Sequence, residues 1–241
     1  MTWYVIESLA GGSTPPTIVS VDGRRGSWIP AALLERHERI DLAGYLDVIR
    51  QDRTEIGERV FSRLGPRHLE ALPILGPDGE VHGLHLWIGD PAGLPPPPDP
   101  VAGIGWNSET GRVGLSTEAW LMASEATDAY RSTLSPDECL RKIVQFDTAA
   151  DLVRLTTAPR DRGAFAGTAT VLHDRGSLMT WQVIARSRKA GHRTDIRGLI
   201  VDISRTEPAA APSAHRNTFG RTGIGPPPRH CSPSRPPSPP R

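Results

Sequence analysis

The stretch that most constrains the fold is 165–204, whose pattern predicts a three-stranded antiparallel meander. Two apolar runs, Phe165–Leu172 and Leu178–Ala185, flank the turn sequence His173–Gly176. A polar link then leads to a third apolar run, Ile196–Ile203. Apolar runs of strand length bounded by turn residues are typical of strands joined by hairpins. We therefore expect an antiparallel sheet here, with the preceding segments covering or repeating it.

The first 92 residues are expected to form a smaller α+β domain. Their pattern predicts two helices and four strands, at 31–39 and 42–50 and at 3–6, 17–21, 68–75 and 81–88. In the second helix, Leu42, Leu46 and Ile49 recur at helical spacing and make one apolar face. The turn sequence Gly76–Gly79 joins the last two strands as a hairpin.

A proline-rich segment follows this first part. Residues 93–100 include four consecutive prolines, which favour extended polyproline geometry and cannot join a sheet ladder. We expect a linker over 93–100, between a domain of residues 1–92 and a domain of residues 101–205. A Pro-rich surface loop within a single domain is the alternative.

Cap signals in the second half predict short helices before the meander. Ser116 is expected to cap the first of them. Ser135, Pro136 and Glu138 have the spacing of a capping box with proline at the first helical position. Asp147 is expected to cap a further helix, which leads to the meander.

The last segment, 206–241, has a composition that predicts disorder. Ten of its 36 residues are Pro, and few large apolar side chains are present. Such a segment cannot offset the entropy of ordering by burying apolar surface. It also holds five arginines and one acidic residue, so the remaining chain is weakly acidic although the whole carries +1.

Charge, hydropathy and cysteine content exclude several classes of function. A weakly acidic body lacks the clustered positive charge that binds phosphate backbones, so we expect no nucleic acid partner. No run approaches the ~20 apolar residues of a membrane helix, and the N-terminus lacks a secretory signal. We therefore expect a cytoplasmic protein with no membrane partner. Cys139 and Cys231 are the only cysteines, which excludes a disulfide framework or a thiolate metal site.

Four short segments of the second half form an ordered set. Gly105-Trp106-Asn107 comes first, Phe146-Asp147 precedes a helix, and Met179-Thr180-Trp181 follows the hairpin turn. Arg197–Ser204 comes last and is similar to a closing strand that ends in Asp-Ile-Ser or Asp-Ile-Thr. Together these segments resemble the PAS domain family over residues 101–205. The resemblance implies a sensory fold with a five-stranded antiparallel sheet and helices on one face.

The resemblance has one departure and a looser extension. Gln145–Thr148 stands where the family usually has a His-Pro-Asp-Asp-like stretch. Residues 1–92 loosely resemble a segment of uncharacterised actinobacterial PAS-containing proteins. Gly83 and Gly198 each enter an apolar final strand, so we expect residues 1–92 to be a degenerate second PAS- or GAF-like domain. Convergent strand chemistry is the alternative, because glycine near strand starts is common.

The strand after the hairpin predicts the wall of a ligand pocket. Because side chains alternate along a strand, Met179, Trp181 and Val183 should face the helices. PAS-like domains hold ligands between sheet and helices, and four further apolar residues complete this candidate pocket: Trp120, Leu152, Phe165 and Val171. An ordinary filled core is the alternative, since aromatic and Met side chains fill cores more often than they line cofactor sites.

Residue types argue against the common PAS cofactors and against a metal. A photoactive flavin domain needs a reactive cysteine in a helical motif that the surroundings of Cys139 do not match. Haem needs an axial histidine, and none lies between Trp106 and Phe165. His82 and His85, three apart on a strand, point to opposite faces and form no metal pair. The cofactor stays unknown, with a small apolar ligand as the remaining candidate.

These patterns predict a signalling protein rather than an enzyme. The sequence contains no nucleophile elbow, phosphate loop or plausible acid–base pair. We expect ligand- or partner-dependent association through the PAS-like domain, with output in trans on a protein partner or a second copy. A ligand-free dimerisation scaffold is the alternative.

Overall fold

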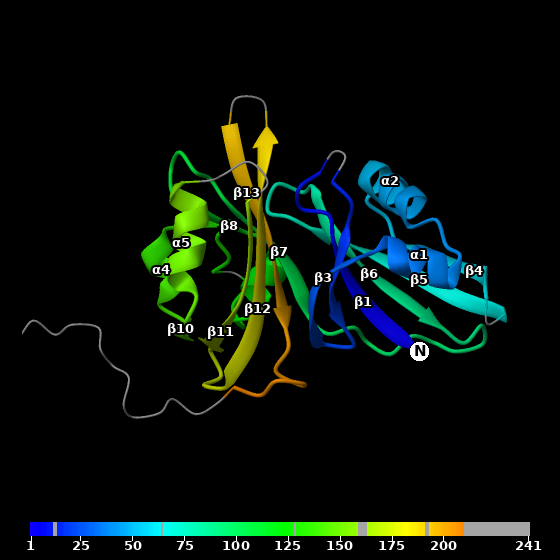
Figure 1. The fold of residues 1–241 in the computed structure, drawn as a ribbon. Coiled ribbons are helices and arrows are strands. Elements are labelled where there is room, and N and C mark those ends of the chain that lie inside the picture. Colours follow the sequence, from blue (N-terminus) through cyan, green and yellow to red (C-terminus); the bar gives the residue numbers. More distant parts are fainter. Residues whose placement is uncertain (12–13, 64, 128, 159–162, 191–192, 210–241) are drawn as a thin grey trace, which may run out of the picture. The chain divides into compact units, whose positions relative to one another are not determined.

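The structure is a computed structural model, which describes residues 1–11, 14–63, 65–127, 129–158, 163–190 and 193–209. These residues belong to one compact unit, residues 1–210. The unit contains two antiparallel sheets, of six and seven strands (Figure 1). The sequence predicts disorder for residues 206–241, and from residue 210 onward this segment lies outside the described residues.

The first sheet has the strand order β3-β2-β1-β6-β5-β4. Its strands are β1 Thr2–Glu7, β2 Thr17–Val21, β3 Arg24–Pro30, β4 Ile56–Ser62, β5 Gly65–Leu75 and β6 Val81–Gly89. Two helices, α1 Ala32–Glu38 and α2 Leu42–Asp52, interrupt the strands between β3 and β4. The predicted helices and strands of this part are confirmed, whereas β3 and β4 were not predicted.

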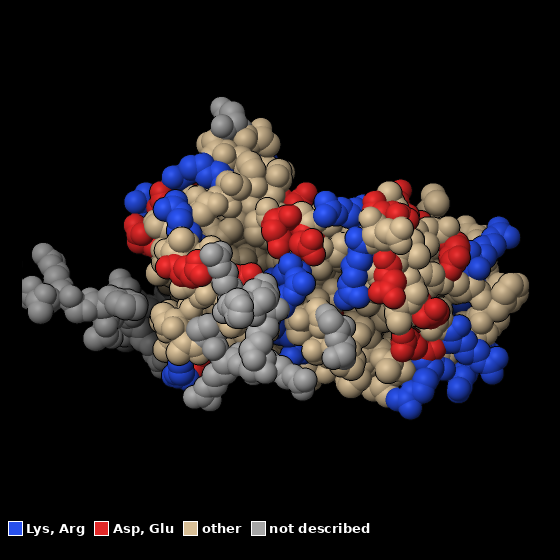
Figure 2. All heavy atoms as spheres, turned by 90° about the horizontal axis from the view of Figure 1, so that it is seen from above, with Lys and Arg blue, Asp and Glu red and all other residues tan. Residues whose placement is uncertain are grey.

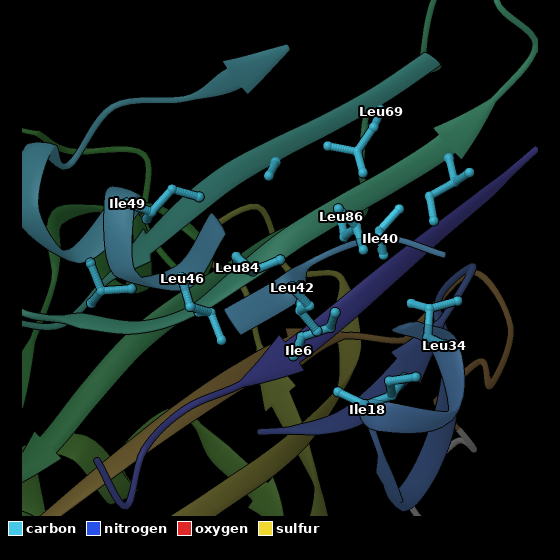
Figure 3. Packing of buried hydrophobic residues seen from close by; sticks show 14 residues of the cluster. Ile6, Ile18, Leu34, Ile40, Leu42, Leu46, Ile49, Leu69, Leu84 and Leu86 are labelled. Atoms are coloured by element: carbon cyan, nitrogen blue, oxygen red, sulfur yellow. The ribbon is translucent and has the colours of Figure 1, made fainter. Parts of the chain in front are cut away.

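An apolar cluster joins the helices to this sheet. Leu42, Leu46 and Ile49 of α2 are fully or almost fully buried, as the helical spacing predicted. Figure 3 shows these side chains among residues from β1, β5 and β6, such as Ile6 and Leu84. Burial of such aliphatic side chains is the main favourable term in holding helices on a sheet.

The second sheet has the strand order β10-β11-β12-β13-β7-β8-β9. Its strands are β7 Val101–Trp106, β8 Val113–Leu115, β9 Thr133–Leu134, β10 Ile143–Gln145, β11 Ala164–Leu172, β12 Leu178–Ala190 and β13 Arg193–Asp202. Three short helices lie between β8 and β11, namely α3 Thr117–Leu121, α4 Pro136–Leu140 and α5 Ala149–Thr157. The predicted meander is confirmed as β11, β12 and β13, but β12 and β13 extend through most of the expected polar link.

The predicted fold class, a five-stranded PAS-like sheet preceded by a smaller α+β domain, is wrong. The structure is mostly β, with sheets of six and seven strands and few helices. The second sheet gains two very short strands, β9 and β10, at its two edges. Strands of two or three residues are too short to show a sequence period, so no pattern could predict them.

The second sheet is also buried on the face opposite its helices. A separate apolar cluster contains Val5, Val19 and Ile74 from the first sheet and Leu199 and Val201 from the second. The two sheets therefore contact each other through side chains, with β13 contributing to the contact. The expectation of a linker over 93–100 between two domains remains a prediction.

Side-chain caps begin two of the short helices as predicted. Ser116 Oγ accepts a hydrogen bond from the Ala119 amide at 3.2 Å. Ser135 and Glu138 form the expected capping box at the start of α4. The cap predicted at Asp147 is wrong, because α5 begins one residue later, after Thr148, without a side-chain cap.

Candidate functional site

A cavity of about 290 Å³ lies between the second sheet and its helices. Its walls are mainly apolar and come from β7, β8, β10–β13 and the helical segment between β8 and β11. Figure 1 shows α4 and α5 on this side of β10, β11 and β12. Mostly apolar concave sites with a few polar groups are the usual form of small-molecule sites.

Strand alternation positions the sheet side of the cavity. Trp181 and Val183 of β12 line it, whereas Ile184 packs on the opposite face of the sheet. On β13, Ile200 lines the cavity, whereas its neighbours Leu199 and Val201 pack toward the first sheet. Side chains of β12 and of β13 therefore pack into two apolar interiors, one on each face of the sheet, because successive side chains of a strand point to opposite faces.

Small side chains on several elements leave the space open. Ala119 on α3, Ala123 just after it and Ala169 on β11 all line the cavity. All three are buried, so their methyl groups face protein rather than solvent. Larger residues at these places would fill the volume, as close-packed interiors normally do. The sequence prediction of the pocket did not include these alanines.

One polar group in the wall has no partner. The Trp181 indole N–H is buried and makes no hydrogen bond among the described residues. The indole of Trp120, in contrast, donates to the Ala126 carbonyl at 2.8 Å. A buried donor without an acceptor is costly, and buried indole N–H groups usually find one.

Charged side chains stand at the edge of the cavity. Arg131 pairs with Glu138 at 2.8 Å, and hydrogen bonding to the Ser135 backbone is the main cause that lowers the pKa of Glu138 to about 2. Lys142 Nζ donates to the Ala123 carbonyl at 2.7 Å and pairs with Asp174 at 2.7 Å. These groups hold the edge together by pairing with each other.

The only described cysteine also lines the cavity. Burial raises the pKa of the Cys139 thiol to about 11, and the nearby acidic residues Glu138 and Asp137 add to this. The thiolate is the nucleophilic form, so this thiol is unreactive near neutral pH. Cys139 therefore acts as a small apolar wall residue rather than as a nucleophile.

The structure brings most of the predicted pocket residues together. Trp120, Leu152, Val171, Trp181 and Val183 line the cavity. The other two support it from the same apolar cluster. Phe165 is buried and packs edge-on against Phe146, a lining residue, at 6.0 Å between ring centroids, and Met179 packs on the cluster. Ligand binding by these residues stays a prediction.

The two histidines of β6 lie in separate surroundings. His82 Nδ1 is 3.0 Å from the Gly198 carbonyl, at the contact between the sheets. His85 packs edge-on against Trp3, with ring centroids 5.6 Å apart. No group of three or more metal-binding side chains occurs in the part of the chain that the structure describes. In the same part, no helix is long and apolar enough to span a membrane.

The N-terminal part of the chain is similar to a known sequence family. Residues 2–98 match the family model described as Rv3651-like, N-terminal. No curated protein matches the chain. The resemblance of residues 1–92 to a segment of uncharacterised proteins therefore has a family counterpart, whereas the PAS resemblance of residues 101–205 has no family match.

The fold is similar to a solved mycobacterial structure. A crystal structure of an uncharacterised protein from Mycobacterium tuberculosis superposes with a TM-score of 0.69 at 16% identity and covers 83% of this chain. This chain spans 63% of that protein's length. A sensory box histidine kinase/response regulator from Burkholderia thailandensis matches 45% of this chain and 81% of its own, with a TM-score of 0.34 and 16% identity. The mycobacterial likeness concerns the fold alone.

Proposed function

We propose that this chain is a cytoplasmic signal-sensing or regulatory protein whose apolar cavity binds a small apolar molecule. The observation that carries the proposal is the cavity itself, about 290 Å³ with mainly apolar walls. We further propose binding rather than catalysis, because the only carboxylate in the described lining, Glu138, is held in an ion pair with Arg131 at the edge of the cavity.

Strand β13 offers a route from the cavity to the rest of the protein. Ile200 touches the cavity, while Leu199 and Val201 on the same strand pack against the first sheet. A ligand that displaces Ile200 would shift the neighbouring residues at the contact between the sheets. We infer that this shift changes association with a partner protein or a second copy, so that the output acts in trans.

A ligand-free dimerisation module is the second candidate. Phe61 is 78% exposed on β4, the edge strand of the first sheet. Unpaired edge strands present backbone groups that a second chain can pair with. An exposed aromatic side chain on such an edge favours this alternative.

Two matched substitutions test whether the cavity is real. Ala169 and Ala185 are both buried in the same apolar cluster on neighbouring strands, but Ala169 lines the cavity and Ala185 does not. Ala169→Leu should fill empty space and leave the free energy of unfolding nearly unchanged. Ala185→Leu should overpack the core and cost about 1–3 kcal/mol. Urea denaturation measures both, and an equal loss in the two variants would show a filled core.

Native mass spectrometry of the full chain, with a denatured control, tests the ligand. We expect a small molecule that is retained in the native protein, released on denaturation and absent from Ala169→Leu. The Ala185→Leu variant, if folded, should retain it. An empty dimer in the native spectrum would instead favour the dimerisation module.

A further inference from the structure

A second hollow, of about 240 Å³, lies where the two sheets meet, and its lining is strongly basic. Four arginines line it together with Ser8, Gly11, Glu80 and Val81. They come from distant parts of the chain: Arg50 and Arg53 from the end of α2, Arg188 from β12 and Arg197 from β13. The carbonyl end of α2 favours cations, which helps to hold Arg50 and Arg53 there.

Carboxylates neutralise only part of this charge. Arg50 pairs with Asp47 at 3.3 Å, and Arg197 pairs with Asp78 at 3.1 Å and with Glu80 at 3.8 Å. Arg53 and Arg188 make no ion pair with any carboxylate of the described residues. Two guanidinium groups in the hollow are thus without an anionic partner.

Arg188 and Arg197 repel each other across neighbouring strands. The Arg197 side chain is only 12% exposed, and burial lowers its pKa. The positive charge of Arg188 lowers the pKa of Arg197 further, and the surrounding carboxylates oppose both effects. A largely buried cation that faces a second, unpaired cation is stabilised by an anion between them.

We propose that this hollow binds a phosphate group, with Arg53 and Arg188 as its principal ligands and Arg50 and Arg197 at its sides. The planar fork of a guanidinium group matches phosphate oxygens with two parallel hydrogen bonds. Arg50 and Arg197 are already paired with carboxylates, so an anion in the hollow would compensate the charges of Arg53 and Arg188. Figure 2 shows blue Lys and Arg side chains gathered near the middle of one face, beside a red acidic group.

Such a ligand would connect the two sheets. Its partners would be α2 from the first sheet's part and β12 and β13 from the second sheet. The site is distinct from the apolar cavity and does not depend on it. Phosphate binding would therefore stabilise the contact between the sheets whether or not the cavity is occupied.

Titration of the full chain with inorganic phosphate at low ionic strength tests the site. Isothermal calorimetry gives the affinity, and thermal unfolding with and without phosphate gives the stabilisation. Arg53→Gln and Arg188→Gln should each weaken phosphate binding by about tenfold or more, the loss expected for a charge-assisted hydrogen bond. Arg188→Lys keeps the charge but loses the fork, so its affinity should lie between those of the wild type and Arg188→Gln.

Arg59→Gln is the matched control. Arg59 is an exposed arginine of β4, so this variant changes the net charge equally but leaves the hollow intact. It should bind phosphate like the wild type. Absence of binding in the wild type, or equal weakening in Arg59→Gln and Arg188→Gln, would overturn the proposal. A parallel titration with phenyl phosphate distinguishes free phosphate from a phosphate ester, according to which of the two binds more tightly.

Discussion

At the scale of single residues, two buried histidines tie stability to pH. Burial lowers the pKa of His85 to about 4, and the charge of Asp99 opposes this only in part. Burial likewise is the main cause that lowers the pKa of His82 to about 4. Both rings are therefore neutral in the folded protein near neutral pH. In the unfolded chain their pKa returns to its ordinary value of 6.5.

Replacing His85 should reduce the loss of stability in mild acid. Between its two pKa values the unfolded state binds more protons, so the free energy of unfolding falls as the pH is lowered from about 6.5 toward about 4. For His85 this amounts to about 2 kcal/mol between about pH 7 and about pH 5. His85→Phe should remove that share, measured by urea denaturation at both pH values.

The cavity residues were partly predictable from sequence. Alternation along β12 identified Trp181 and Val183, because the side-chain period of a strand is fixed by backbone geometry. The alanines that keep the space open were missed. An alanine such as Ala169 has the same pattern whether its neighbours close over it or leave a gap, and only the packing of distant helices decides which occurs.

At the scale of elements, β13 separates two apolar interiors, and its residues should differ in energetic cost. Leu199 is fully buried against the first sheet, whereas Ile200 faces the cavity. Leu199→Ala should cost about 3–5 kcal/mol, as expected for a close-packed leucine. Ile200→Ala should cost only about 2 kcal/mol, because part of its surface has no packing partner to lose. Urea denaturation of ligand-stripped protein compares them, and equal costs would contradict an open cavity.

Central strands were predictable and edge strands were not. β6 and β13 carry long apolar runs, which mark strands buried on both faces. The edge strands β3 and β4 contain Arg24-Arg25 and Glu58-Arg59 instead. Charged residues suit edges because they hinder pairing with other chains, and they also hide the strand from a search for apolar periodicity. The double burial of β13 was readable in Leu199-Ile200-Val201 but was interpreted as a one-sided sheet.

At the scale of the whole molecule, a buried ion pair joins the two sheets. Glu7 of β1 is almost fully buried and accepts hydrogen bonds from Arg186 Nε at 3.0 Å and from the Leu9 amide at 2.9 Å. Arg186 also lies over the Trp28 ring, 4.1 Å from its centroid. Removing one member of a buried pair leaves the other charge without compensation.

Arg186→Ala should therefore destabilise the protein by about 3–5 kcal/mol. Because the apolar and ionic contacts join the sheets, the compact unit should unfold in a single transition in the wild type. Differential scanning calorimetry measures both the transition count and its shift. Arg154→Ala breaks an exposed pair on α5 and should change stability by less than about 0.5 kcal/mol. Two separate wild-type transitions would show that the sheets unfold independently.

The position of β13 has a consequence for biosynthesis. This strand pairs with β12 on one side and with β7 on the other, although β7 precedes it by most of the second half of the chain. A ribosome that adds ~5–20 residues per second therefore releases β7 several seconds before its partner exists. During that interval the second sheet is incomplete, and the wall that Ile200 supplies is missing. The cavity can receive a ligand only once β13 has been made, so occupancy would distinguish finished molecules from nascent ones.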